Sequence, residues 1–159
     1  MKRLVAIGLI ALMLFAAVPA AAQTSGNIYQ MLQKDSSFSK MVSLLHTTNQ
    51  DRSLIVAGPF TILAPTNDAF NKLSPLALQG LMSGRLIQSG FARNSMISGK
   101  YTTDQLVSMG YARTLDGRRL PVTRASDGSV MIGGAKVVKP NIAASNGIIQ
   151  GVDAIIIPS

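Results

Sequence analysis

The chain has no cysteine, no tryptophan and no glutamate, and its single histidine is His46. The lack of cysteine excludes disulfides, a cysteine nucleophile, a thiolate zinc site, an iron–sulfur cluster and a lipid-modified N-terminal cysteine. A lone histidine has no second histidine with which to share a metal, so we expect His46 simply to end a helix. All seven acidic residues are aspartates, and they are too scattered for chemistry that needs paired carboxylates.

The motifs of common catalytic sites are also missing. No Gly-x-Ser-x-Gly sequence offers a nucleophilic serine, and no spacing of acids and histidine fits a metal site. Gly133-Gly134 precedes a predicted strand, whereas a phosphate loop needs a helix N-terminus. We therefore predict no catalytic residue, no metal and no cofactor, and we interpret the chain as a binding or interaction module rather than an enzyme.

The N-terminal segment has the three parts of a secretory signal. Lys2-Arg3 is followed by an uncharged apolar run over 4–18 and by small residues at 20–22, which predicts a signal peptide over 1–22. The alternative is a membrane anchor, but the apolar run is shorter than the roughly 20 residues that span a bilayer. We expect 23–159 to be one domain, exported to the periplasm or the exterior, with no transmembrane segment after cleavage.

Basic residues outnumber acidic ones. Without Lys2 and Arg3, 13 lysines and arginines face 7 aspartates, a net charge of +6. These bases are spread along the chain, and only Arg118 and Arg119 are adjacent. Two interpretations stay open: a solvated surface that favours solubility, or attraction to anionic glycans or lipid headgroups. Nucleic acid is not an expected partner, because export separates the chain from it and no basic recognition helix is visible.

Hydrophobic spacing predicts helices first and strands afterwards. Helical patterns cover 27–35 and 36–49, with Ser36 or Ser37 as the cap of the second. A further helix is expected from Ser74-Pro75 to Gly84, with an apolar side formed by Leu76, Leu78, Leu81 and Met82. Another is expected from the capping box Thr102–Gln105 to Gly110. Residues 85–97 are ambiguous between a helix and a helix that turns into a strand. Short strands joined by Asp-Gly turns are predicted over 113–115, 118–124, 129–133 and 135–140, and 147–158 is one bent strand or a strand pair.

The stretch FTILAPTNDAF combines a strand and a helix start. Apolar alternation from Phe60 to Ala64 predicts a half-buried strand that must pair with a distant part of the chain. Pro65 ends it. Thr66 or Asn67 then caps a helix that has Asp68 in its first turn and Phe70 on its buried side. The order of elements predicts an α+β domain in which the later strands form an antiparallel meander.

Two segments together resemble the fasciclin domain. Residues 60–73, FTILAPTNDAFNKL, resemble its first signature, and 133–158, with Asn146-Gly147 and Asp153, resemble its second; 96–106 resemble a segment between them. The resemblance implies a fasciclin-like fold, a wedge-shaped antiparallel β-sandwich with several packed α-helices. It also implies an extracellular, non-enzymatic module that adheres to cells, matrix proteins or glycans. A few members of the family bind lipophilic pigments.

Positions that depart from the family pattern, and a pair of adjacent arginines, are predicted to be interaction residues. Asn94 and Ser95 stand where the family often has Tyr-His, and Gln150 replaces a histidine of the second signature. Asn141-Ile142 stand where animal members have an Asp-Ile pair linked to integrin binding, which argues against animal-type integrin adhesion. Arg118 and Arg119, beside a predicted hairpin tip, are candidates for an anionic contact, with an ordinary solvated hairpin as the alternative.

The expected partners are an envelope or extracellular protein, an anionic polysaccharide or a host surface. The alternative is a carrier of a lipophilic small molecule, such as a carotenoid or a lipid, in an adaptable pocket lined by methionines. Those methionines would be Met31, Met41, Met82, Met96, Met109 and Met131, which can equally be plain core filling. A structural envelope protein without a specific partner is a third possibility.

Overall fold

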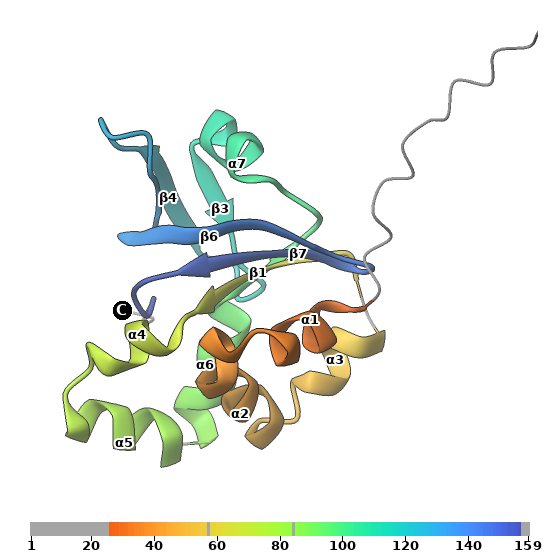
Figure 1. The fold of residues 1–159 in the computed structure, drawn as a ribbon, viewed down its shortest axis with the longest axis vertical. Helices are drawn as coiled ribbons and strands as arrows, with labels where there is room; N and C mark the ends of the chain where they lie inside the picture. Colours follow the sequence, from red (N-terminus) through yellow and green to blue (C-terminus); the bar gives the residue numbers. More distant parts are fainter. Residues whose placement is uncertain (1–25, 57, 84, 157–159) are drawn as a thin grey trace, which may run out of the picture.

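The computed structural model describes residues 26–56, 58–83 and 85–156, so the predicted signal peptide lies outside the described residues. Helices dominate the first half and strands the second (Figure 1). The helices are α1 (Ile28–Lys34), the 3₁₀ helix η1 (Ser36–Phe38), α2 (Ser39–Thr47), α3 (Asp51–Val56), α4 (Asn67–Asn71), α5 (Pro75–Ser83), α6 (Arg85–Asn94) and α7 (Thr103–Met109). The strands are β1 (Phe60–Pro65), β2 (Met96–Ser98), β3 (Tyr111–Arg113), β4 (Arg119–Arg124), β5 (Val130–Ile132), β6 (Ala135–Ala144) and β7 (Gly147–Val152).

The strands form one seven-stranded sheet in the order β2-β1-β7-β6-β5-β4-β3. The predicted α+β class is confirmed, as is the antiparallel meander from β3 to β7. The expected non-local pairing of β1 is confirmed too, because Phe60 lies opposite Gly147 of β7. That pair of strands is parallel, so the sheet is mixed rather than wholly antiparallel.

The sheet curls until its two ends meet. Ile97 of β2 forms an antiparallel bridge with Thr114, just after β3. Next to it, the Leu115 N–H donates a hydrogen bond of 2.8 Å to the Met96 carbonyl. The β3–β4 hairpin is therefore held beside β2 although it stands at the far end of the strand order.

Two hydrophobic cores lie on opposite faces of β1 and β7. Helices α1 to α6 cover one face, while α7 and strands β3 and β4 lie on the other (Figure 1). In β1, Ile62 and Ala64 pack into the helix-side core and Leu63 packs into the strand-side core. The expected half-buried alternation of β1 is therefore wrong: both faces are covered, and 61–65 are all buried.

Glycine at position 147 lets β7 approach β1 closely. A β-carbon at Gly147 would lie 1.9 Å from the Phe60 carbonyl oxygen and 2.7 Å from Cδ1 of Ile28. Contacts under 3.0 Å are not compatible with a real side chain. The glycine of the second signature is therefore a packing requirement of this pair of strands.

Several local predictions about the helices are confirmed. Thr102 and Gln105 form the capping box of α7, and Gly110 ends that helix in the left-handed region at φ 73°. His46 lies in the last turn of α2, where its Nδ1 is 3.1 Å from Oδ2 of Asp51 in α3. Helix α3 itself was not predicted.

The expected cap of the second helix is wrong. Ser36 and Ser37 lie within η1, whose cap is Asp35, and the carboxylate of Asp35 accepts the Ser37 N–H at 2.9 Å. Helix α2 begins after Phe38, which has no capping side chain. The cap is instead supplied by Asn67, whose Oδ1 accepts the Lys40 N–H at 3.0 Å.

The remaining predictions about helix and strand positions are confirmed only in part. Helix α5 starts at Pro75 as predicted and buries Leu81, but Leu76 is 79% exposed rather than on an apolar side; Gly84 lies outside the described residues. The ambiguous stretch resolves into α6 followed by β2. The strand expected over 113–115 is β3, which ends at Arg113 because the turn at Asp116-Gly117 begins directly afterwards.

Candidate functional site

The β3–β4 hairpin is built around a tight turn. The Thr114 N–H donates to the Arg118 carbonyl at 2.9 Å, and the Gly117 N–H donates to the Thr114 carbonyl at 3.0 Å. The Asp116 carboxylate accepts from the Thr114 hydroxyl. This confirms the hairpin that the Asp-Gly pair predicts, and it places Arg118 and Arg119 directly after the tip.

The outer face of this hairpin carries two opposed arginines. Tyr111 pairs with Pro121 and Arg113 with Arg119, so these four side chains share one face of the pleat. We call them the arginine face. The alternate residues, Ala112 and Leu120, are buried in the strand-side core.

The arginine face is not neutralised by neighbouring acids. The guanidinium of Arg119 lies over the Tyr111 ring, 4.9 Å from its centroid, an attractive cation–π arrangement. Within the described ranges, neither Arg113 nor Arg119 has a carboxylate partner. Arg118, in contrast, has its Nε 3.3 Å from Oδ2 of Asp116. Like charges directly opposite each other across two strands are destabilising, and no carboxylate among the described residues offsets this repulsion.

A hollow of about 490 Å³ lies beside the arginine face. We call it the Asn94 hollow; Arg118 and Arg119 line it together with Asn94, Pro121, Gly133 and Ile156. The structure thus brings together three candidates that lie in two separate parts of the sequence. Sequence reasoning missed Ile156 and Gly133, because nothing in a single sequence shows that the β5–β6 turn and the C-terminal segment reach the hairpin.

Asn94 and Ser95 are both only 1% exposed, which corrects the expectation that they form an open surface. They are buried because they join the end of α6 to β2 inside the fold. The Ser95 hydroxyl donates to the Phe91 carbonyl at 2.9 Å, and the Ser95 carbonyl accepts the Leu63 N–H at 2.7 Å. Ser95 is therefore structural, whereas Asn94 still lines the hollow.

Asn94 carries an unsatisfied polar atom. Its Nδ2 donates to the Ile156 carbonyl at 2.9 Å, but its Oδ1 is buried without any hydrogen-bond partner in the described residues. Most buried polar atoms in native proteins have a partner. This oxygen is therefore a buried acceptor inside the fold, out of reach of solvent.

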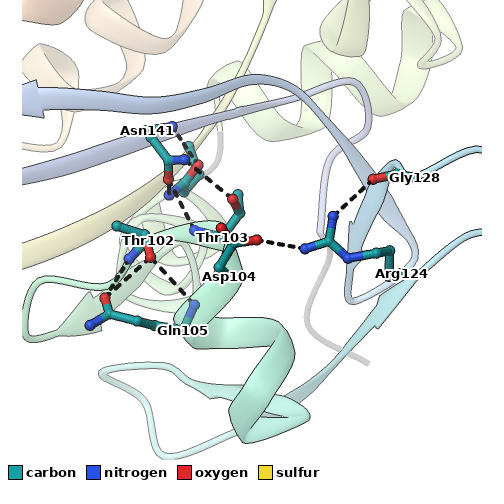
Figure 2. Close-up of polar contacts among 8 residues, drawn as sticks. Thr102, Thr103, Asp104, Gln105, Arg124, Gly128 and Asn141 are labelled. Atoms are coloured by element: carbon teal, nitrogen blue, oxygen red, sulfur yellow. Dashed lines mark hydrogen bonds and ion pairs between the residues drawn. The ribbon is translucent and has the colours of Figure 1, made fainter.

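Asn141 is used inside the domain (Figure 2). It has a φ of 54°, and its Oδ1 accepts the Thr103 N–H at 3.0 Å, at the start of α7. The same oxygen accepts from Nε2 of Gln150 at 2.8 Å, and Oε1 of Gln150 accepts the Asn141 N–H at 2.9 Å. Ile142 packs against the helix-side core. Both side chains are therefore engaged in the fold, although Asn141 is exposed and Ile142 half-buried, and neither lines the Asn94 hollow; their role in an interaction stays a prediction.

The α7 region also has a surface ion pair. Arg124 of β4 donates to Oδ1 of Asp104 at 2.6 Å and to the Gly128 carbonyl at 3.3 Å (Figure 2). This arginine links α7 to the β4–β5 turn. It is therefore held by internal contacts, unlike the arginine face.

Signature residues connect distant elements. Oδ1 of Asn146 accepts the Ile28 N–H at 2.8 Å at the start of α1, and its Nδ2 donates to the Leu54 carbonyl in α3. Asp153 accepts the Lys136 N–H at 2.9 Å and lies 3.3 Å from Nζ of Lys72. These contacts tie the first helices to the start of β7, and the β5–β6 region to its end.

Another hollow, of about 370 Å³, lies beside β3, β2 and α7. Its lining includes Tyr101, Tyr111, Ile97, Leu106 and Met109, so we call it the tyrosine hollow. The prediction that the six methionines line one pocket is wrong. Met41 and Met96 are buried in the helix-side core, Met31 and Met82 pack against that core, and Met131 lies in β5, away from the residues that line this hollow.

The pKa values of Asp35 and Asp127 are lowered, which favours the charged form of both carboxyl groups. A hydrogen bond from Lys139 lowers the pKa of Asp35, with Nζ and Oδ2 2.6 Å apart, and Ser37 adds to the effect. Hydrogen bonds from the Ser129 hydroxyl and backbone lower the pKa of Asp127. Both lie in ordinary turns and caps, away from the two hollows.

Neither a metal cluster nor a membrane helix is found in the described part of the chain. No group of three or more histidines and aspartates there is placed to hold a metal ion. None of its helices is both long enough and apolar enough to cross a bilayer.

Known proteins share sequence similarity with most of this chain. The fasciclin domain profile matches residues 36–158. Protein sll1483 of Synechocystis is 30% identical over 143 residues, covering 87% of this chain and 77% of that protein. Human periostin is 25% identical over 137 residues, covering 86% of this chain but 16% of periostin.

A solved structure shows the same fold. The FAS1 domain pair of the insect cell adhesion molecule Fasciclin I superposes with a TM-score of 0.76 at 17% identity, over 84% of this chain and 51% of that one. The matched region is therefore about half of the length of that Fasciclin I chain. Fasciclin domains are in general adhesion or interaction modules. Since its profile spans most of the chain, this protein belongs to the fasciclin domain family.

Proposed function

We propose that the domain is a non-enzymatic adhesion module of the cell envelope or exterior, and that its arginine face binds an acidic polysaccharide. The observation that carries the proposal is the pairing of Arg113 with Arg119 across β3 and β4. Both are exposed, and no carboxylate in the described residues offsets them. A partner with repeated negative charges would attract both arginines and offset the repulsion between them.

The surroundings of the pair suit a polysaccharide. Tyr111 and Pro121 form the neighbouring pair on the same face, with Arg119 over the Tyr111 ring, and aromatic side chains are common in binding interfaces. Exposed charges act over about 8 Å at physiological ionic strength. Binding should therefore be strong at low salt and should weaken as salt rises.

The test is a titration of the purified protein with an acidic polysaccharide by calorimetry. The double variant Arg113→Gln/Arg119→Gln should bind at least about tenfold more weakly and with less salt dependence. Arg52→Gln is the matched control, since Arg52 is exposed on α3, across the sheet from the hairpin. Equal affinities of the double variant and the control would overturn the proposal. So would binding only to an acidic protein from the envelope.

Export to the periplasm or the exterior is part of this proposal. It is supported by the basic, apolar and small-residue order of residues 1–22. Sequencing the N-terminus of protein recovered outside the cytoplasm tests it. A start at Gln23 is expected, and an intact Met1 would contradict it.

The tyrosine hollow favours a second candidate function, binding of a lipophilic small molecule. Its aromatic and aliphatic lining is typical of small-ligand pockets, although Arg113 and Thr114 also line it. Native mass spectrometry of protein purified from its own host should then show a bound mass that Met109→Lys removes. A ligand-free protein would argue against this function.

A further inference from the structure

We infer that the tyrosine hollow binds a small amphiphile with a single negative charge, whose apolar part lies in the hollow and whose charged head contacts Arg113. This ligand class rests on the lipophilic-ligand function proposed for the same hollow, and it adds the charge of the ligand. Three features of the hollow support it: accessible apolar surface, a wall that is held in place, and one cation without a partner in the described residues.

The apolar surface of the hollow is accessible to a ligand. Tyr101, Tyr111 and Leu115 line it and are each half-buried, so part of each side chain stays exposed. Met109, at the end of α7, also lines it and is 39% exposed. A ligand with an apolar part would remove this surface from water, which is favourable. The hollow therefore favours a ligand that is at least partly apolar.

The wall formed by Tyr101 is held in place by β1. The Thr61 hydroxyl accepts the Tyr101 N–H at 2.9 Å and donates to the Gly99 carbonyl at 2.8 Å. Gly99 has a φ of 105°, and a β-carbon there would lie 2.8 Å from Cε2 of Tyr101. The ring thus packs against a position where glycine leaves room for it. This wall is in place before a ligand arrives, which lowers the ordering cost of binding.

The charge at the hollow has one sign. Among the ten described residues that line it, Arg113 alone is charged. Arg113 is exposed and has no carboxylate partner in the described ranges. The acid nearest to it in sequence, Asp116, is engaged by the Thr114 hydroxyl and lies 3.3 Å from Nε of Arg118. A guanidinium without a partner beside apolar surface favours a ligand whose head carries one negative charge, and it sets that charge rather than the shape of the head.

Arg113 belongs both to this hollow and to the arginine face, where it lies opposite Arg119. A bound amphiphile would neutralise one of the two charges that are proposed to attract an acidic polysaccharide. The two ligands should therefore weaken each other's binding by the same factor. This consequence rests on the proposed polysaccharide binding, whereas the site in the hollow does not.

The test compares four probes by calorimetry with the purified protein. They are octanoate, 1-octanol, octyltrimethylammonium and acetate, each used below the concentration at which it forms micelles. Octanoate should bind at least about fivefold more tightly than octanol or the octyl cation, because a charge-assisted hydrogen bond adds to the same apolar contact. Acetate lacks the apolar part and should give no measurable binding.

Two variants separate the charge from the apolar surface. Arg113→Gln should lower the affinity for octanoate at least about fivefold and leave that for octanol unchanged. Met109→Ser should weaken binding of both by about threefold, because it removes apolar surface from the rim. Arg52→Gln, which removes an exposed charge on α3, is the control and should change neither. Circular dichroism and thermal melting verify that each variant folds.

The outcomes at the hollow separate the charged ligand from a neutral one. If octanol bound as tightly as octanoate, or if Arg113→Gln left octanoate binding unchanged, the inference would be overturned while a neutral lipophilic ligand stands. If no octyl probe bound, the lipophilic-ligand function would fall together with the inference. Tighter binding of octanoate that depends on Arg113 supports the charged ligand.

A competition experiment tests the shared role of Arg113. Saturating octanoate should weaken binding of an acidic polysaccharide by about threefold in the parent and not in Arg113→Gln. Unchanged polysaccharide binding in the parent would show that the head of the amphiphile does not contact Arg113. If the polysaccharide does not bind at low salt even without octanoate, the polysaccharide function falls and the site in the hollow stands.

Discussion

The side chain of Asn67 caps helix α2, a helix that lies 27 residues earlier in the sequence. Its Oδ1 accepts the Lys40 N–H at 3.0 Å, and its Nδ2 donates to the Ser36 carbonyl at 2.9 Å. Thr66, the residue before it, takes the N-cap position of α4 without a side-chain bond. The first signature therefore joins the start of one helix to the start of another.

Replacing Asn67 by alanine should lower the free energy of unfolding by about 1–2 kcal/mol, because the Lys40 N–H at the start of α2 loses its side-chain acceptor. Urea unfolding followed by circular dichroism measures the change. Asn71→Ala is the control, since Asn71 makes an exposed contact with Nζ of Lys40. Equal effects of the two substitutions would contradict the capping role.

Two glycine-to-alanine substitutions should have opposite effects. Gly147→Ala places a β-carbon 1.9 Å from the Phe60 carbonyl oxygen, so β7 must move away from β1. We expect a loss of at least about 3 kcal/mol, the upper end of overpacking costs. Gly80→Ala lies in α5 with nothing within 4 Å of the new atom, so it should stabilise by about 0.5–1 kcal/mol.

Thermal melting of both glycine variants checks this pair of predictions. Loss of soluble Gly147→Ala protein is also consistent with the expected clash. A Gly147→Ala protein that melts at the temperature of the parent would show that the strands do not need this close approach.

Local chemistry made part of the fold predictable. The capping box of Thr102 and Gln105, the stop at Gly110 and the Asp116-Gly117 turn depend on neighbours within a few residues, and all three are observed. The hairpin in turn placed Arg118 and Arg119 correctly beside its tip. The family signatures then supplied the class of fold.

Long-range packing made the rest unpredictable. Alternation in β1 suggested one exposed face, yet the strand-side core covers it. Asn94 looked like a surface position because a single sequence does not show that α6 turns inward there. The opposition of Arg113 and Arg119 depends on the register of the hairpin, which the sequence leaves open by a residue or two.

Gln150 should be a stabilising residue rather than a passive replacement for the family histidine. It is fully buried, and its carboxamide joins the Asn141 side chain and backbone. Gln150→Leu would leave the Asn141 N–H without its acceptor, which should cost about 1–3 kcal/mol. Urea unfolding measures the loss, and a double-mutant cycle with Asn141→Ala should show a coupling of at least about 0.5 kcal/mol. Additive effects would contradict the network.

The ion pair between Asp35 and Lys139 should make stability depend on acid pH. The hydrogen bond from Lys139 lowers the pKa of Asp35 in the folded state below its ordinary value. A lowered folded-state pKa means that the unfolded state binds protons first as pH falls. The stabilisation is therefore complete above the unfolded-state pKa of about 4, and it is lost as pH falls through the lower folded-state value.

The variant Asp35→Asn keeps a capping oxygen for Ser37 but removes the charge. At pH 7 it should be less stable than the parent by under about 1 kcal/mol, since the pair is partly exposed. That difference should shrink between about pH 4 and pH 2, when urea unfolding is repeated at each pH. Lys139→Met, which removes the cause of the pKa shift, should flatten the same part of the profile. If the stability difference between the parent and Asp35→Asn stayed constant down to pH 2, the charge of Asp35 would not contribute to stability. Asp35 would then act only as a helix cap, whose contribution does not depend on the charge.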